Sequence, residues 1–415
     1  MIPSLLLSVI LALQTPLNTE GPAAAQADSW PGFRGAGTSH SLGEDLPVSW
    51  SEDENLAWTL PLTGQGQSSP VVVGDRVFVT SIRGAKKEHC IIACVSLASG
   101  ELLWQRTFAA SHRQELSDMV TQAAPTPAAD TARVYALFES GDIFALDHQG
   151  NLLWQRALVS DYGEFEGNHG VGSSPVLVDD QLVVLLDHAG PSYLLALDVA
   201  TGNNRWKRDR SPRVSWTTPV VHRRAQRNQL VISSNGTVDG INPSNGKLLW
   251  SLEGITGNTI PSPTAWGDRI LVAASKGTGC RLLHRESPAG PPVIKWEAQG
   301  ARPSGFGSPL VLGDRVYLIN KSGSLFALDL ESGEVAAEAE VAGGCWASPL
   351  AAQGLIYAFG KDGTTLVLRP GSTDIETVAE NELECSSTVY GVAVASGSIL
   401  IRETSRLRCL RLAAK

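Results

Sequence analysis

A strand–turn–strand unit that recurs about eight times constrains this 415-residue chain more than any other feature. Three copies show it best: PVVVGDRVFVTS from Pro70, PVLVDDQLVVLL from Pro175 and PLVLGDRVYLIN from Pro309. Each copy opens with Ser-Pro, runs through a short apolar strand, turns at a Gly-Asp or Asp-Asp pair, and enters a second strand. The looser openings stand at Pro125 or Pro127, Pro219, Pro263, Pro349 and Val392. A fixed period of this kind indicates a repeat architecture.

A second strand–turn–strand unit follows each opening. FALDHQGNLLW ends at Trp154 and YLLALDVATGNNRW ends at Trp206, and glycines such as Gly150 and Gly202 supply the positive φ that a tight hairpin needs. Each copy therefore holds four short antiparallel strands, and no long stretch has helical periodicity. We predict an all-β fold, an eight-bladed β-propeller of four-stranded antiparallel blades, because stacking blades in a ring buries both faces of every sheet.

The two ends of the repeat region complement each other. The last copy runs through three strands to Leu412 and lacks its fourth, Trp-bearing strand, whereas NLAWTLPL at residues 55–62 resembles that missing strand. We therefore predict that this N-terminal strand closes the ring. The predicted organisation is a signal peptide at 1–27, a lead segment at 28–54 and the propeller at 55–413. Because the lead contains no repeat strand, removal of residues 26–43 is expected to cost little stability.

Tryptophan recurs in one register of the fourth strand. The six positions are Trp58, Trp104, Trp154, Trp206, Trp250 and Trp296. We interpret them as structural rings wedged between neighbouring blades, since evenly repeated aromatics are typical of a core. Stacking on a carbohydrate or a cofactor is the functional alternative. Ala336 and Ala337 stand where the sixth blade would carry its ring, and the seventh blade lacks one too, so that sector should be packed differently.

Composition and the N-terminus limit the location of the protein. The formal net charge is −9 and no long Lys/Arg stripe is present, which argues against binding to nucleic acid. An apolar run from Leu5 to Leu13 precedes possible cleavage sites at Ala23, Ala25 and Ala27, so we expect a signal peptide and export to the periplasm or beyond. No Cys lies near the cleavage sites, so no N-terminal lipid anchor is expected. No other segment is apolar enough to span a membrane.

The motif ALDVATGNNRW at 196–206 resembles the pyrroloquinoline-quinone-like repeat. That family includes quinoprotein alcohol dehydrogenases and the outer-membrane assembly factor BamB. The opening WPGFRGAGTSH, together with LPVSWSEDENLAW, is similar to exported propellers of planctomycete-type bacteria. The resemblance implies the fold; for the dehydrogenases it also implies a quinone, a calcium ion, a catalytic Asp and typically two adjacent cysteines. No two cysteines are adjacent here, and no motif assigns the Asp or the calcium ligands. BamB-like chains are about this size and bind proteins without chemistry.

The sequence offers no catalytic, cofactor-binding or metal-binding residue. No histidine pair has H-x-x-x-H spacing, and the Ser-Pro openings lack the G-x-S-x-G context of a nucleophile and recur in blade after blade, so we expect them to be structural. The residues three positions before each opening should meet at the mouth of the central channel, and the alternative is that they pack beneath the connecting loops. The candidate binding residues there are Gln67, Gln122, Trp216, Phe306 and Trp346.

The resulting functional prediction is a non-enzymatic, exported, monomeric propeller. It would bind or scaffold protein partners in the cell envelope, resembling BamB, and would need no cofactor. Two alternatives remain open: a quinone-dependent dehydrogenase, and a carbohydrate- or glycopeptide-binding module or hydrolase.

Overall fold

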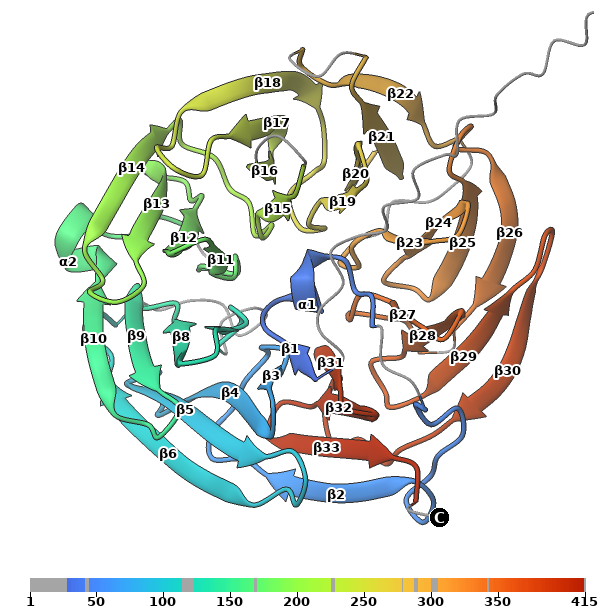
Figure 1. Ribbon diagram of the computed structural model, residues 1–415, viewed down its shortest axis with the longest axis horizontal. Coiled ribbons are helices and arrows are strands. Elements are labelled where there is room, and N and C mark those ends of the chain that lie inside the picture. Colours follow the sequence, from blue (N-terminus) through green and yellow to red (C-terminus); the bar gives the residue numbers. More distant parts are fainter. Residues whose placement is uncertain are drawn as a thin grey trace, which may run out of the picture.

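The computed structural model describes residues 28–41, 45–113, 123–167, 170–224, 228–277, 279–286, 290–299, 305–341 and 343–413. Eight antiparallel sheets stand around a central channel (Figure 1), which confirms the predicted eight-bladed β-propeller. Within these residues the helices are α1 (Arg34–Gly37) and α2 (Leu158–Tyr162), and neither is long and apolar enough to cross a bilayer. The expected signal peptide, 1–27, lies outside the described residues.

Each blade runs from an innermost strand at the channel to an outermost strand at the rim. Blade 1 comprises β3 (Val71–Val73), β4 (Arg76–Arg83), β5 (His89–Ser96) and β6 (Leu102–Ala109). Blade 2 comprises β7 (Ala128–Ala129), β8 (Arg133–Leu137), β9 (Asp142–Asp147) and β10 (Leu152–Ala157). Blade 3 comprises β11 (Val176–Val178), β12 (Gln181–Leu186), β13 (Ser192–Asp198) and β14 (Asn204–Arg210). Blade 4 comprises β15 (Val220–His222), β16 (Gln229–Ser234), β17 (Gly236–Ile241) and β18 (Leu248–Ile255).

The second half of the ring repeats the same order. Blade 5 comprises β19 (Thr264–Trp266), β20 (Arg269–Ala273), β21 (Cys280–His284) and β22 (Val293–Glu297). Blade 6 comprises β23 (Leu310–Leu312), β24 (Arg315–Ile319), β25 (Ser324–Asp329) and β26 (Val335–Glu340). Blade 7 comprises β27 (Leu350–Ala352), β28 (Leu355–Phe359), β29 (Thr365–Pro370) and β30 (Ile375–Asn381). Blade 8 comprises β31 (Gly391–Ala395), β32 (Ser398–Arg402), β33 (Arg406–Arg411) and β2 (Leu56–Pro61).

Blade 8 is completed by the N-terminal strand, as predicted. In the antiparallel pairing of β2 with β33, Trp58 lies opposite Cys409 and Leu60 lies opposite Leu407. The two ends of the repeat region therefore share one sheet, and the ring has no open edge between blades 8 and 1.

The core lies between the blades, because both faces of the middle strands are covered. All six residues of β12 are buried, for example, whereas the outermost strand β10 has one buried residue and exposes three of its six. A β-bulge interrupts the fourth strand of every blade one residue before the tryptophan position. Such a bulge re-aims the residue that follows it, and here that residue is the one that reaches the next blade. All six cysteines are free thiols.

The six repeated tryptophans occupy that position, each opposite a residue of the neighbouring third strand. Five indole N–H groups donate to a backbone carbonyl of the next blade, as Trp154 Nε1 does to Val199 O at 3.0 Å. The sixth, Trp250, donates to the side chain of Gln229 in its own blade. The Trp154 ring also lies on Gly202, where an added Cβ would stand 2.7 Å from the ring. The rings thus link consecutive blades.

The contact between the Trp154 ring and Gly202 predicts that two single substitutions strongly destabilise the protein. Trp154→Ala should lower the free energy of unfolding by about 3–5 kcal/mol, because it empties a buried aromatic site. Gly202→Ala should also be costly, because φ is +71° and the new methyl group would displace the ring. Gly313→Ala is the matched control: φ is +62° there, but a Cβ would meet no atom within 4 Å, so only strain of roughly 1–2 kcal/mol remains. Urea denaturation measures all three, and equal effects of the two glycine variants would contradict the contact.

The lead segment supplies none of the repeat strands, but it forms an additional strand of blade 1, so its removal is not expected to cost little stability. β1 (Ser29–Trp30) pairs with β3 as a fifth strand of blade 1, and the Trp30 side chain is 1% exposed. The chain then crosses the channel through α1, which Figure 1 shows in blue at the centre of the ring. It returns beside β27, where Ala351 N donates to Ser39 O at 2.9 Å.

The next part of the lead fills the sector that lacks a repeated tryptophan. Trp50 is 3% exposed and stacks on Tyr357 of blade 7 with a centroid distance of 6.4 Å. Two residues on, Glu52 accepts a hydrogen bond from Arg408 of blade 8. The lead therefore supplies an aromatic ring where blade 7 has only Ala379 in the register.

Candidate functional site at the mouth of the central channel

A ring of hydroxyl groups joins the innermost strands at the mouth, the end of the channel where the chain enters each inner strand. The residue before each opening proline donates its backbone N–H to the hydroxyl of its counterpart in the next blade. The links, at 2.9–3.0 Å, run from Ser69 through Thr126, Ser174, Thr218, Ser262 and Ser308 to Ser348. Blade 8 has Gly391 there, and an added Cβ would lie 2.2 Å from Ser69 Oγ. The Ser-Pro repeat is therefore a structural device, and Pro127 is the opening of blade 2.

Three aromatic rings line one side of the mouth, and we call them the aromatic row. Phe306 of blade 6 contacts Trp346 of blade 7 with a centroid distance of 5.1 Å, and Trp346 contacts Tyr390 of blade 8 at 5.5 Å. All three side chains are half-buried. They border a cavity of about 60 Å³ to which the lead contributes Trp30 and Arg34. The row thus offers aromatic surface beside a cationic group.

The other predicted mouth residues do not join this row. Trp216 of blade 4 packs against blade 3, where its Nε1 donates to Gly170 O at 3.1 Å and its ring lies against Gly172. Gln67 is half-buried. Gln122 lies outside the described residues, and with Pro127 as the opening the equivalent position is Ala124. That all five residues form one binding surface at the mouth therefore remains a prediction, whereas Phe306 and Trp346 do meet.

Two residues of this region escaped the sequence interpretation. Tyr390 was missed because blade 8 opens with Val392, and counting three positions back selects Val389. Arg34 was missed because it lies in the lead, outside the repeat. The WPGFRG stretch, with two aromatics and an Arg ahead of the first strand, was the available signal.

Arg34 is a buried cation without a carboxylate partner among the described residues. Its guanidinium donates to Ser39 Oγ at 2.9 Å, Thr264 Oγ1 at 2.8 Å and Pro309 O at 2.7 Å, and the residue is 4% exposed. Desolvation lowers the Arg34 pKa to about 9, so the group stays protonated at neutral pH. Burial also lowers the pKa of nearby His40 to about 4, which leaves that imidazole neutral. The lead thus places one net positive charge in the channel.

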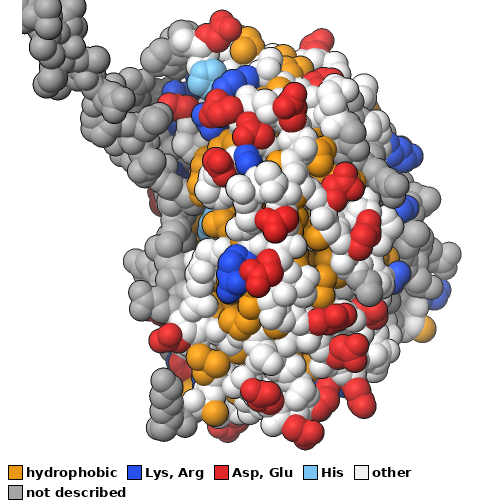
Figure 2. Space-filling model, turned by 90° about the vertical axis from the view of Figure 1, so that its right-hand side faces the viewer, with side chains coloured by type: hydrophobic (Ala, Val, Ile, Leu, Met, Phe, Trp, Pro, Cys, Tyr) orange, Lys and Arg blue, Asp and Glu red, His pale blue; other side chains and the backbone are white. Residues whose placement is uncertain are grey.

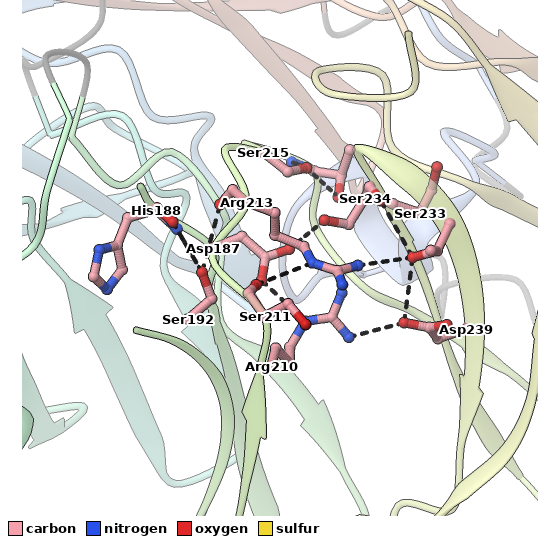
Figure 3. Close-up of polar contacts among 12 residues, drawn as sticks. Asp187, His188, Ser192, Arg210, Ser211, Arg213, Ser215, Ser233, Ser234 and Asp239 are labelled. Carbon is pink, nitrogen blue, oxygen red and sulfur yellow. Dashed lines mark hydrogen bonds and ion pairs between the residues drawn. The ribbon is translucent and has the colours of Figure 1, made fainter. Parts of the chain in front are cut away.

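A second polar cluster lies between blades 3 and 4 (Figure 3). Arg210 bridges two carboxylates, with Nε 2.9 Å from Asp187 and Nη1 3.0 Å from Asp239. Ser234 also donates to Asp187. The Arg210–Asp187 pair lies within blade 3, whereas Asp239 and Ser234 contact it from blade 4. Removal of one charged partner would leave a buried charge unpaired. The cluster therefore acts as a clamp between blades.

The neighbouring Ser192 and His188 do not form a catalytic pair with Asp187. The Ser192 hydroxyl donates to the backbone carbonyl of His188 at 3.0 Å, and His188 Nδ1 accepts the N–H groups of Glu166 and Gly190. A serine nucleophile needs its hydroxyl on the imidazole of the base, and this geometry does not provide it. Nowhere in the described parts of the chain do three His, Cys, Asp or Glu side chains gather as a metal site.

Comparison with known sequences gives a consistent family. A family model described as "Outer membrane protein assembly factor BamB" matches residues 29–211, 89–336 and 192–415. BamB of Shewanella oneidensis is 21% identical over 283 residues, covering 68% of this chain and 65% of that protein. BamB of Yersinia pestis is 24% identical over 305 residues, covering 71% and 70%. BamB of Moranella endobia is 25% identical over 232 residues, covering 54% and 53%. The matches thus span between about half and 70% of these relatives' own length.

Comparison with solved structures shows the shared fold. BamB from Moraxella catarrhalis superposes with a TM-score of 0.64 at 15% identity, covering 87% of this chain and 98% of that one. The quinohemoprotein alcohol dehydrogenase from Comamonas testosteroni superposes with a TM-score of 0.67 at 14% identity, covering 94% and 82%. The structural likeness extends to BamB and to an alcohol dehydrogenase alike, so it shows the fold and does not separate their functions. Because the matched sequence stretches together span residues 29–415, the chain belongs to the BamB family of pyrroloquinoline-quinone-like β-propellers.

Proposed function

We propose that this protein is a non-enzymatic propeller that binds protein partners in the cell envelope through the aromatic row. The observation that carries the proposal is the position of the lead. Residues 28–41 pair with β3, cross the channel and return beside β27, so the protein's own chain occupies the place where a channel ligand would sit. Binding is then a task for the mouth and the outer surface.

The space left in the channel supports this choice over an enzyme. Two cavities flank the lead, with volumes of about 100 and about 60 Å³. Pockets for cofactors and drug-sized ligands measure roughly 300–1,000 Å³. A tricyclic quinone with its calcium ion would have to displace the lead, and with it the buried Trp30.

The aromatic row has the features of a protein contact site. Aromatic rings that combine large apolar area with few rotatable bonds dominate many interfaces. Phe306, Trp346 and Tyr390 come from three consecutive blades and remain half-buried rather than covered. The rim differs from this site, because the charged side chains on the face in Figure 2 are mainly acidic. Strands β26 and β30 expose Glu338, Glu340, Glu376 and Glu380. An acidic rim also disfavours nucleic acid as the partner.

Location in the cell envelope is part of the same proposal. The apolar stretch and small residues within 1–27 support export, and the relatives' name, outer membrane protein assembly factor, associates those proteins with the outer membrane.

Site-specific cross-linking tests the proposal. A photo-reactive phenylalanine analogue at position 346 should cross-link an envelope protein in living cells of the native host. The same analogue at Thr377, exposed on strand β30 of blade 7, should not. Phe306→Ala should reduce the cross-linking at position 346, because the neighbouring ring is part of the same surface. Cross-linking that is absent at 346, or equal at 346 and 377, would refute the aromatic row as the contact site.

A further inference from the structure

The larger of the two cavities is lined by residues that have no part in the proposed function. It lies between the lead and the inner strands of blades 2 to 5 and has a volume of about 100 Å³; we call it the channel cavity. Apolar side chains such as Val176, Leu177 and Val220 form much of its wall. Its polar lining includes Thr218 and Ser262 of the hydroxyl ring, and its charged lining residues are Arg34 and Arg223. No Asp or Glu belongs to the described lining.

Arg34 brings an uncompensated positive charge to this cavity. Buried charges in proteins are normally paired with an opposite charge or a ligand. The hydrogen-bond partners of Arg34 among the described residues are hydroxyl and carbonyl oxygens, which are neutral. Pro263, whose carbonyl oxygen lies 3.4 Å from Arg34 Nη1, is itself part of the cavity wall. The guanidinium therefore borders the cavity with its charge unmatched by any carboxylate in the described chain.

The hydroxyl ring adds hydrogen-bond donors at the same place. Thr218 Oγ1 accepts the N–H of Ser174, and Ser262 Oγ accepts the N–H of Thr218. A hydroxyl has one hydrogen to donate besides its lone pairs. Among the described contacts, neither hydroxyl donates that hydrogen to a protein acceptor. The cavity thus presents a cation and two free O–H groups, but no anionic acceptor of its own.

We propose that the channel cavity binds a small monocarboxylate, with its carboxylate group on Arg34 and the hydroxyl ring and its short apolar tail against the valine and leucine wall. A carboxylate fits because charge-assisted hydrogen bonds from a guanidinium to its oxygens are among the strongest available. The size of the cavity limits the tail. Because a cavity of about 150 Å³ takes the six carbon atoms of benzene, about 100 Å³ accommodates roughly four non-hydrogen atoms, which is the size of acetate.

Calorimetric titration of the mature protein tests this inference. The probes are acetate, the neutral isostere acetamide and inorganic phosphate, in a buffer low in chloride. Acetate should bind saturably at one site, whereas acetamide and phosphate should bind at least tenfold more weakly, because one lacks the charge and the other lacks the apolar part. Equal binding of acetate and acetamide, tighter binding of phosphate, or no saturation up to about 10 mM would each contradict the proposal.

Matched variants locate the site. Arg34→Lys should weaken acetate binding at least tenfold, because an ammonium cannot reproduce the planar guanidinium contacts. Arg402→Lys is the control, since Arg402 is also fully buried and without a carboxylate partner among the described residues, yet it does not line the cavity. If Arg34→Lys fails to fold, Leu177→Phe fills the cavity without touching Arg34, and Leu312→Phe on blade 6 is its control. Unchanged affinity of Leu177→Phe for the carboxylate probe would overturn the assignment. This outcome does not depend on whether the aromatic row binds a protein partner.

Discussion

Removal of residues 28–62 is expected to unfold the whole ring rather than to loosen one blade. The deletion takes away β2, so β33 loses its partner and blade 8 keeps only three strands. It also takes away Trp58, whose ring lies on Gly100 of blade 1 and whose Nε1 donates to Leu97 O at 3.0 Å. A propeller with one unpaired interface exposes the apolar faces of two blades, and that cost affects the entire closed structure.

Thermal denaturation followed by circular dichroism measures this effect. A protein that begins at residue 28 is the control and should melt in one cooperative transition. The protein that begins at residue 63 should show no cooperative transition or a much lower melting temperature. An unchanged melting temperature would refute closure by β2.

Removal of the lead alone, up to residue 43, should also be strongly destabilising. Trp30 is fully buried, and loss of a buried aromatic side chain alone costs about 3–5 kcal/mol. The same deletion removes the β1–β3 pairing and exposes the inner strands that α1 covers. We therefore expect the free energy of unfolding to fall by at least about 5 kcal/mol.

Urea denaturation of this second truncation gives the comparison. Trp30→Phe, which keeps an aromatic ring in the same site, should lose far less stability than the truncation. If the free energy of unfolding of the truncated protein lay within about 0.5 kcal/mol of that of the parent, the lead would contribute as little as a typical exposed segment.

The propeller could be predicted from the sequence because its information is repeated. Ser-Pro openings, hairpin glycines and the tryptophan register each recur at corresponding positions, so one weak local pattern is confirmed by its copies. Closure by β2 could be predicted for the same reason, since NLAW matches the fourth-strand pattern.

The parts that were not predicted depend on contacts between residues that are distant in the sequence. Arg34 reaches Thr264 and Pro309, more than 200 residues away, and nothing in the local sequence indicates those partners. Trp50 likewise depends on Tyr357 of blade 7. The hydroxyl ring was visible only as a Ser-Pro motif, because its hydrogen bonds connect one blade to the next and have no local signature.

The central proposal is that the protein's own chain takes up the space in the channel that a quinone would need, so that protein partners bind at the mouth. Titration with pyrroloquinoline quinone and calcium, followed by quenching of tryptophan fluorescence, tests it most directly. We expect no saturable site below about 10 µM, equivalent to roughly −7 kcal/mol, because the quinone would have to expel residues 28–41. A sub-micromolar site with dye-reducing activity toward alcohols would contradict this account and identify the protein as a dehydrogenase.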